Sequence, residues 1–394
     1  MRFRNNPPLK RSVVLCAALL LLLLSSCTFP SVITSSSTPA ITTTVTTTVT
    51  KAPVTVTTAI TPTSTTAIAT VPTTSSTTTA STVKVQSVLT NSGVTGNITR
   101  RFDWSYKGVN WWYEVNLSNA LYKSYEDRPR IQLEDWAVYA THPGNEWLTK
   151  GLADAIKRDG AKYGYSDYDM VETAILFAQG IPYTTDADTK GKSDYPRFPI
   201  ETVVENTGDC EDHAFLLAAV TSALGYDTVL LDFPTHLAVG IAGDDSIKGT
   251  YYNWRGKRFY FIETTATGWK LGQVPDKFKG MSATIMDLTA HPVYFCTWSY
   301  PAWQGYIPLT VNIENRGSAD ATDVVVHAGC DAGNNQVWNQ VKSASFNIGV
   351  DNKATVQINI TPPRGKHTRV MVWVTSGDTT VHQSFGDTWF DTNP

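Results

Sequence analysis

The feature that most limits how this chain folds is a low-complexity segment near its N-terminus. Residues 31–83 consist almost entirely of Thr, Ser, Val, Ala, Ile and Pro, and their one charged side chain is Lys51. Such a segment has no periodic apolar face whose burial would offset the entropy lost on ordering it. We therefore expect residues 27–83 to form a disordered tether, so that the folded structure lies after position 83.

The first residues have the pattern of an export signal. Four basic residues precede an apolar run at 13–24, which is too short to span a bilayer as a helix. The run ends in the letters LSSC, which resemble the lipobox of bacterial lipoproteins, in which the cysteine is acylated and becomes the new N-terminus. Residues 1–26 are predicted to be a lipoprotein signal peptide, and Cys27 to anchor the protein at the outer face of the cell membrane. Ordinary cleavage beside an incidental Cys27 is the alternative.

The distribution of charge argues against a nucleic-acid partner. The first acidic residue is Asp103, so the net charge of −3 combines a basic N-terminal stretch with an acidic remainder. Binding to nucleic acid requires several cations that neutralise phosphates, and the remainder has no stripe of Lys and Arg. We expect the partners to be a protein or cell-wall peptide substrate and, through the lipid anchor, a membrane.

The cysteine count agrees with export. Cys16 is removed with the signal and Cys27 is lipidated, which leaves Cys210, Cys296 and Cys330. An odd remainder in an exported protein indicates that one thiol stays free. Pairing of Cys296 with Cys330 is left open, because the sequence does not give the Cα separation that a disulfide requires.

The middle of the chain has apolar residues at helical spacing, followed by strand-like segments. Helices are predicted over 144–159, after a cap at Ser166, and from Cys210 to Leu224. The strand-like segments, rich in β-branched and aromatic residues, are 226–233, 236–243, 251–254 and 257–264. Helices that precede an antiparallel sheet predict an α+β domain, which we assign to 84–300.

The last part of the chain contains strand-length segments only. They are separated by turn clusters and lie at 307–313, 323–328, 344–348, 354–360 and 369–374. This pattern predicts an all-β sandwich over 301–394.

One stretch carries the residues for chemistry. The chain has no phosphate loop, zinc-binding helix or dinucleotide glycine motif, so no cofactor is expected. The segment 206–214 places Cys210 in the first turn of a predicted helix, where unpaired N–H groups and the helix dipole lower the pKa of a thiol. Its neighbours are Asp209 and Glu211, whereas a buried structural cysteine would have apolar neighbours. Cys210 is therefore the predicted nucleophile.

A thiolate needs a proton carrier and a group that orients it. His236 begins a predicted strand and is the candidate base, while Glu263 lies among aromatic residues, where a carboxylate requires a cationic or hydrogen-bonding partner. His213 is a rival base one turn after Cys210. A metal held by Cys210 and His213 would lack further ligands, so no metal is expected.

These motifs resemble the transglutaminase-like superfamily, in particular its bacterial and archaeal cysteine-peptidase branch. The matching segments are GDCED at 208–212, PTHLAV at 234–239, YFIETT at 260–265, FAQGIPY at 177–183 and YPRFPIET at 195–202. The resemblance covers about 110–285. It implies a papain-like core with the cysteine on a central helix and the histidine and acid on adjacent strands, and it implies that Gln179 is an oxyanion donor. Animal transglutaminases have Asp where this chain has Glu263, so Asp232 is the alternative third residue.

The β-domain carries a second resemblance. The letters VNIENRGSADA at 311–321 resemble the turn of CARDB-like bacterial adhesion domains of immunoglobulin type. The resemblance implies a spacing or binding role for this domain.

Together these motifs support a surface-tethered thiol enzyme that acts on amide bonds through a thioester. Transfer of the thioester to water, as in a peptidase, or to an amine, as in a transamidase, is left open. The alternative is a non-catalytic binding module displayed on a stalk.

Overall fold

A computed structural model describes residues 44–46, 83–90, 97–131, 135–303, 305–334 and 336–393. The predicted signal peptide, Cys27 and most of the predicted tether lie outside these residues. Within the tether, Thr44–Thr46 forms strand β1, which pairs with a strand of the C-terminal domain and differs from the expected disorder. No helix in the described ranges has the length and apolar character needed to cross a bilayer.

The described α-helices are α1 (Asn119–Glu126), α2 (Ala137–Thr141), α3 (Glu146–Lys162), α4 (Asp167–Gln179), α5 (Asp186–Lys190), α6 (Pro199–Glu205) and α7 (Cys210–Leu224). The strands before residue 290 are β1 (Thr44–Thr46), β2 (Val83–Thr90), β3 (Asn97–Tyr106), β4 (Val109–Ser118), β5 (Thr228–Phe233), β6 (His236–Gly243), β7 (Tyr251–Trp254), β8 (Lys257–Ile262) and β9 (Thr284–Asp287). The later strands are β10 (Tyr294–Ser299), β11 (Ile307–Asn315), β12 (Ala321–Gly333), β13 (Gln336–Lys342), β14 (Phe346–Ile348), β15 (Lys353–Ile360), β16 (His367–Thr368), β17 (Val370–Ser376), β18 (Thr379–Phe385) and β19 (Phe390–Asp391).

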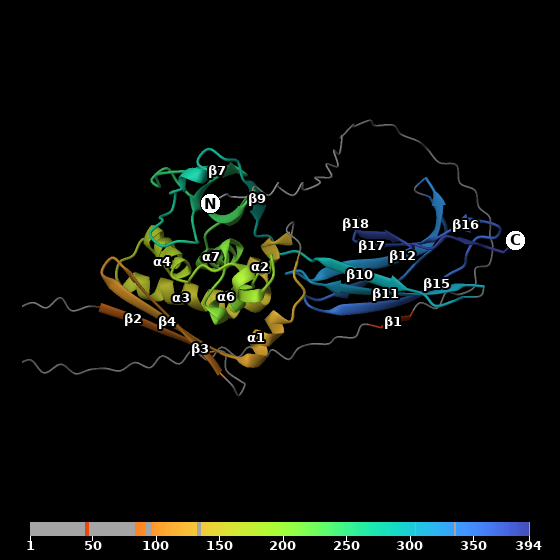
Figure 1. Cartoon of the computed structure of the whole chain (residues 1–394), viewed down its shortest axis with the longest axis horizontal. Helices are drawn as coiled ribbons and strands as arrows, with labels where there is room; N and C mark the ends of the chain where they lie inside the picture. The colour runs from red at the N-terminus through yellow and green to blue at the C-terminus, as the bar shows by residue number, and fades with distance from the viewer. Residues whose placement is uncertain are drawn as a thin grey trace, which may run out of the picture. The chain divides into compact units, whose positions relative to one another are not determined.

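Helix α7 forms the centre of the first domain. It contacts α2, α3, α4 and α6 on its sides and β5 and β6 on its remaining face (Figure 1). Its side chains from Ala214 to Val220 are all buried, as expected for a helix that is apolar nearly all round. The helix begins and ends where the sequence predicted, and Gly225 after it has a φ of +96°, which favours glycine.

An antiparallel sheet with the order β7-β8-β6-β5-β9 covers α7. Four of its five strands, β5 to β8, are those expected from the sequence. One face packs on the helices through Leu230, Leu237 and Val239, and the other forms a smaller core with Phe233 and Phe278. The domain is thus a mixture of helices and an antiparallel sheet, as predicted.

A second sheet, in the order β2-β4-β3, was not predicted. In β4 the residues Val109, Trp111, Tyr113 and Val115 are buried and alternate with half-buried polar and aromatic residues. That alternation is the period-two pattern of a half-buried strand.

The C-terminal domain is a β-sandwich. The sheets β1-β15-β11-β10 and β13-β12-β17-β18 share one core of buried aliphatic side chains. Strand β10, which precedes the predicted boundary between 300 and 301, is hydrogen-bonded to β11. Cys296 lies in one sheet and Cys330 in the other, and both are free thiols.

Candidate active site

Cys210 is the first residue of α7, and the turn before it is shaped by close packing. Asp209 has an extended backbone at the N-cap, with φ −106° and ψ −154°. Gly208 is required there, because a Cβ atom at this position would lie 2.6 Å from the Cβ of Asp212. The carbonyl of Gly208 also accepts a hydrogen bond of 2.9 Å from the N–H of Thr184. These contacts fix the position of the sulfur at the start of the helix.

The thiol of Cys210 has two polar neighbours. Its sulfur donates to Oε2 of Glu211 at 3.1 Å, and it accepts a hydrogen bond from the backbone N–H of Leu237 at the start of β6. Burial and the charge of Glu211 raise the pKa of the thiol. The sequence predicted a lowered pKa, which is wrong for this arrangement, because desolvation and the adjacent carboxylates outweigh the helix N-terminus.

His236 lies beside Leu237 and is buried. Its Nε2 atom is 3.0 Å from Oε2 of Glu263, a contact that is an ion pair when the ring is protonated, although the N–H is not aligned as a hydrogen bond. The ring stacks on Phe278, with centroids 4.7 Å apart and planes 10° apart. Because Leu237 contacts the sulfur, the structure brings Cys210, His236 and Glu263 to one place.

Glu263 is buried but well partnered. Its Oε1 atom accepts hydrogen bonds from the N–H groups of Thr264 and Thr265, both at 3.0 Å, and from the hydroxyl of Thr265 at 2.7 Å. Burial raises the pKa of this carboxyl group, but the contacts with His236 and Thr265 outweigh it and lower the pKa to about 2. Glu263 is therefore ionised at neutral pH and can stabilise a positive charge on the imidazole.

Gln179 is 3% exposed, and its side-chain amide is fully used by the loop after β8. Nε2 donates to the carbonyls of Glu263 at 2.8 Å and Trp269 at 3.0 Å, while Oε1 accepts from the N–H of Gly268 at 3.2 Å. A substrate oxyanion would have to displace one of these carbonyls to receive the hydrogen bond that the sequence analysis expected. The observed contacts hold Glu263 and its loop in place.

The two alternative residues have other positions. Asp232 is paired in register with Leu237, and Phe233 with His236, so the side chains of Asp232 and His236 point to opposite faces of the sheet. His213 is fully buried, its Nδ1 lies 3.0 Å from the carbonyl of Thr264, and burial lowers its pKa. Among these candidates, Glu263 is the acid in contact with the imidazole of His236.

A buried arginine that the sequence analysis did not single out organises the acids near Cys210. Arg197 has no exposed surface, and its guanidinium donates to Asp186 at 2.6 Å, to Asp212 at 2.7 Å and to Glu205 at 2.9 Å. The signal for it is a single basic residue among the aromatic, proline and aliphatic residues of the motif at 195–202.

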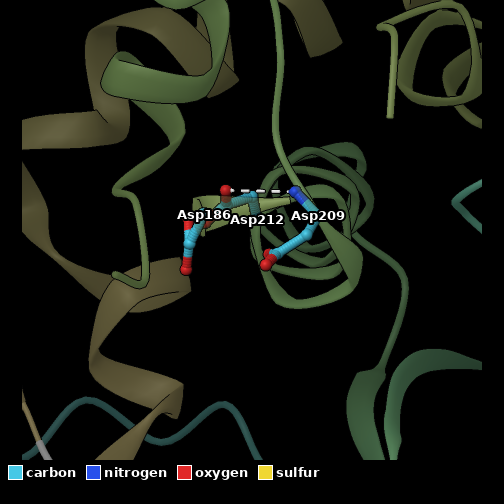
Figure 2. A group of neighbouring side chains, drawn as sticks. All are labelled: Asp186, Asp209 and Asp212. Atoms are coloured by element: carbon cyan, nitrogen blue, oxygen red, sulfur yellow. Dashed lines mark hydrogen bonds between the residues drawn. The ribbon is translucent and has the colours of Figure 1, made fainter. Parts of the chain in front are cut away.

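Asp186, Asp209 and Asp212 have the carboxylate spacing of a cation site, with candidate ligand atoms within 4.8 Å of one another (Figure 2). Because Arg197 contacts two of the three, a guanidinium already supplies the positive charge there. Asp209 differs, because its Oδ1 atom is buried without a hydrogen-bond partner among the described residues. Burial and the neighbouring Glu211 raise the pKa of Asp209.

Comparisons with known proteins do not assign the chain to a family. No protein-family model matches the chain, and no curated protein matches it. The CARDB domain of PF1109 from Pyrococcus furiosus is 15% identical, with a TM-score of 0.20, and the match covers 27% of this chain and 96% of that domain. Red sea bream transglutaminase is 10% identical, with a TM-score of 0.19, and the match covers 76% of this chain and 62% of that one. At such TM-scores the function must be argued from the site itself.

Proposed function

We propose that this protein is a thiol enzyme that acts on amide bonds, with a transglutaminase-like core and with Cys210, His236 and Glu263 as its catalytic residues. One observation carries the proposal. The sulfur of Cys210 contacts the backbone beside His236, and the imidazole of His236 contacts a carboxylate that is ionised at neutral pH. This order of thiol, imidazole and carboxylate is what nucleophilic catalysis requires.

The contacts suggest how the three groups divide the work. The carboxylate of Glu263 contacts Nε2 of His236 and so favours the tautomer that carries its proton on Nε2. The other ring nitrogen, Nδ1, is then free to receive the proton of Cys210. The thiolate then attacks the amide carbonyl, and the imidazolium donates its proton to the leaving amine. The first N–H groups of α7 have no partner within the helix and supply positive potential for the oxyanion.

Gln179 receives a positioning role in this proposal. Its amide group holds the carbonyl of Glu263 and the loop that includes Gly268 and Trp269. The carboxylate that orients His236 is thereby fixed from the end of α4. The thioester on Cys210 passes to water or to an amine.

The site of action follows from the sequence. We propose that export and acylation of Cys27 hold the protein at the outer face of the membrane, where it acts on a protein or a cell-wall peptide. The C-terminal sandwich is proposed to be a CARDB-like, immunoglobulin-type domain that spaces or binds. One observation favours the alternative of a non-catalytic binding module, namely the raised pKa of Cys210.

Alkylation of the folded protein tests the proposal. Peptide-resolved mass spectrometry should show that the reaction of Cys210 with iodoacetamide at pH 7.5 depends on His236, because the imidazole accepts the proton of the thiol. Cys296 and Cys330, whose pKa values burial raises to about 12 and about 11, are internal references that should not respond to changes at His236. His236→Ala should slow the reaction of Cys210 by roughly tenfold or more, because loss of the imidazole should raise the pKa of the thiol by about one unit and so lower the fraction of thiolate tenfold. Asp232→Asn is the matched control and should leave the rate unchanged. A rate at Cys210 that is insensitive to His236→Ala would support the binding module.

A further inference from the structure

The contact between Cys210 and Glu211 is unusual for a helix. Adjacent residues of an α-helix point in directions about 100° apart and do not normally face each other. Here the sulfur of Cys210 nevertheless donates to Oε2 of Glu211 at 3.1 Å, and Glu211 is only 6% exposed. The first turn of α7 therefore directs a buried carboxylate at the thiol of Cys210.

The charge of Glu211 is not balanced by a nearby cation among the described contacts. Arg197 is the buried cation of this region, and it donates to Asp186, Glu205 and Asp212. The side chain of Glu211 is instead hydrogen-bonded to Asp209 and to the thiol of Cys210. The titratable and charged groups that face Cys210 and Glu211 from the surrounding elements are Tyr183, Asp186, Asp194, Arg197, Asp209, Asp212 and His236.

We propose that Glu211 is a positioning residue that holds the Cys210 thiol in its protonated form, so that the thiolate–imidazolium pair with His236 forms only when this hydrogen bond is broken. The proposal rests on the proposed function, because it assigns a control to the same nucleophile. When the bond breaks, the proton of the thiol passes to Nδ1 of His236 and Glu211 remains a carboxylate. Movement of this negative charge away from the sulfur favours the thiolate.

The geometry around Glu211 explains why the control is specific. Oε2 of Glu211 accepts the proton of the thiol, and in the proposed mechanism the competing acceptor is the imidazole of His236, the residue before the Leu237 N–H that contacts the sulfur. Burial and the charge of Glu211 both raise the pKa of the thiol, whereas the N–H of Leu237 opposes them. Of these, the charge of Glu211 is the contribution that one isosteric substitution removes.

Glu211→Gln is the test, since it removes the charge and keeps the size of the side chain. The pH dependence of iodoacetamide alkylation at Cys210 is measured by peptide mass spectrometry on the whole exported chain. We expect the midpoint to fall by about one pH unit, which makes alkylation at pH 7 roughly tenfold faster. Asp194→Asn is the matched control. It removes an exposed charge near Glu211 without touching the thiol, and it should shift the midpoint by less.

The variants also separate this inference from the proposed function. If Glu211→Gln leaves the midpoint unchanged while His236→Ala slows alkylation, the role of Glu211 is overturned and the catalytic assignment stands. If His236→Ala has no effect in either background, the catalytic assignment fails, and the midpoint of Glu211→Gln still reports on the thiol. Circular dichroism checks folding. If Glu211→Gln does not fold, Glu211→Asp takes its place, because it moves the carboxylate away from the sulfur by one methylene. Glu211→Asp must then lower the midpoint of Cys210 alkylation, and an unchanged midpoint would show that the proposal is wrong.

Discussion

Two glutamates on opposite sides of the site are equally buried and behave in opposite ways. Glu263 is 3% exposed and Glu211 is 6% exposed. The contacts of Glu263 lower its pKa to about 2, whereas burial raises the pKa of Glu211. The difference lies in the partners. Glu263 accepts hydrogen bonds from backbone N–H groups and a hydroxyl and contacts an imidazole. Glu211 is hydrogen-bonded to a thiol and to another carboxyl group. Burial alone does not decide the ionisation of an acid, because donors and nearby charges decide it too.

The same difference divides the site into two functional halves. On the strand side, the ionised carboxylate of Glu263 lies 3.0 Å from Nε2 of His236. On the helix side, the acids Asp209 and Glu211 favour a neutral thiol on Cys210. Under the proposed function, the free protein would have an oriented base and a nucleophile that is still protonated.

The largest effect is expected from the strand side. Glu263→Gln should keep the fold and lower turnover by roughly 10³–10⁴-fold, since loss of the orienting carboxylate leaves the imidazole in the wrong tautomer. Glu263→Asp should keep part of the activity, because the carboxylate survives at shorter reach. Hydrolysis of a p-nitrophenyl ester measures this without knowledge of the natural substrate.

Asp232→Asn is the control for this series, and its rate should stay within a few-fold of the wild-type rate. If Glu263→Gln stays within a few-fold and Asp232→Asn abolishes hydrolysis, then Asp232 takes the third role. The opposite pKa shifts of Glu263 and Glu211 would then affect the stability of the fold and not the catalytic rate.

Local signals in the sequence were enough to predict some parts of this site and not others. Helix α7 and strand β6 could be placed because a cap at Asp209, a stop at Gly225 and runs of β-branched residues are local. The amide of Gln179 reaches a carbonyl 84 positions away, and no spacing rule shows such a contact. The resemblance singled out Gln179, but the contacts of its amide could be seen only in three dimensions.

The ionisation of the nucleophile was mispredicted for a related reason. A helix N-terminus lowers the pKa of a cysteine when the neighbouring side chains are neutral or basic. The sequence shows Asp209 and Glu211 beside Cys210, but it does not show that Arg197 is occupied by Asp186, Glu205 and Asp212. Only the pairing pattern shows which acids remain without a cation.

A smaller effect is expected on stability, from the helix side. A carboxyl group whose pKa is raised in the folded state stabilises the fold while it is protonated, and this contribution is lost as the pH rises. Burial and Glu211 raise the pKa of Asp209, so the wild-type protein should lose stability between about pH 5 and pH 9. Asp209→Asn should be more stable than the wild type at pH 8, by on the order of 1 kcal/mol, and no less stable at pH 4.

Urea unfolding at several pH values measures this difference. Asparagine is also a good N-cap residue, so the substitution does not remove the helix start. An advantage of Asp209→Asn that is the same at pH 4 and pH 8 would mean that the carboxyl group is not the cause. The comparison between the two sides of the site would then lose its electrostatic basis.

The smallest expected effect concerns the charge of small reagents that reach Cys210. The carboxylates of Glu211 and of the exposed Asp194 near it create a negative potential at the thiol, which attracts cations and repels anions. A methanethiosulfonate reagent with a trimethylammonium group should therefore modify Cys210 a few-fold faster than one with a sulfonate group, relative to their rates with a free thiol. The ratio of the two rates should fall at 0.5 M salt, because exposed charges are screened there.

Two variants serve as test and control. Asp194→Asn should lower the ratio, since that exposed carboxylate lies near Glu211. Asp276→Asn should not change it, because Asp276 is an exposed acid that pairs with Lys279 outside this cluster. Equal rates for the two reagents at low salt would mean that Glu211 carries no net negative charge at the thiol in solution, and the proposed effect of Glu211 on Cys210 would lose its electrostatic basis.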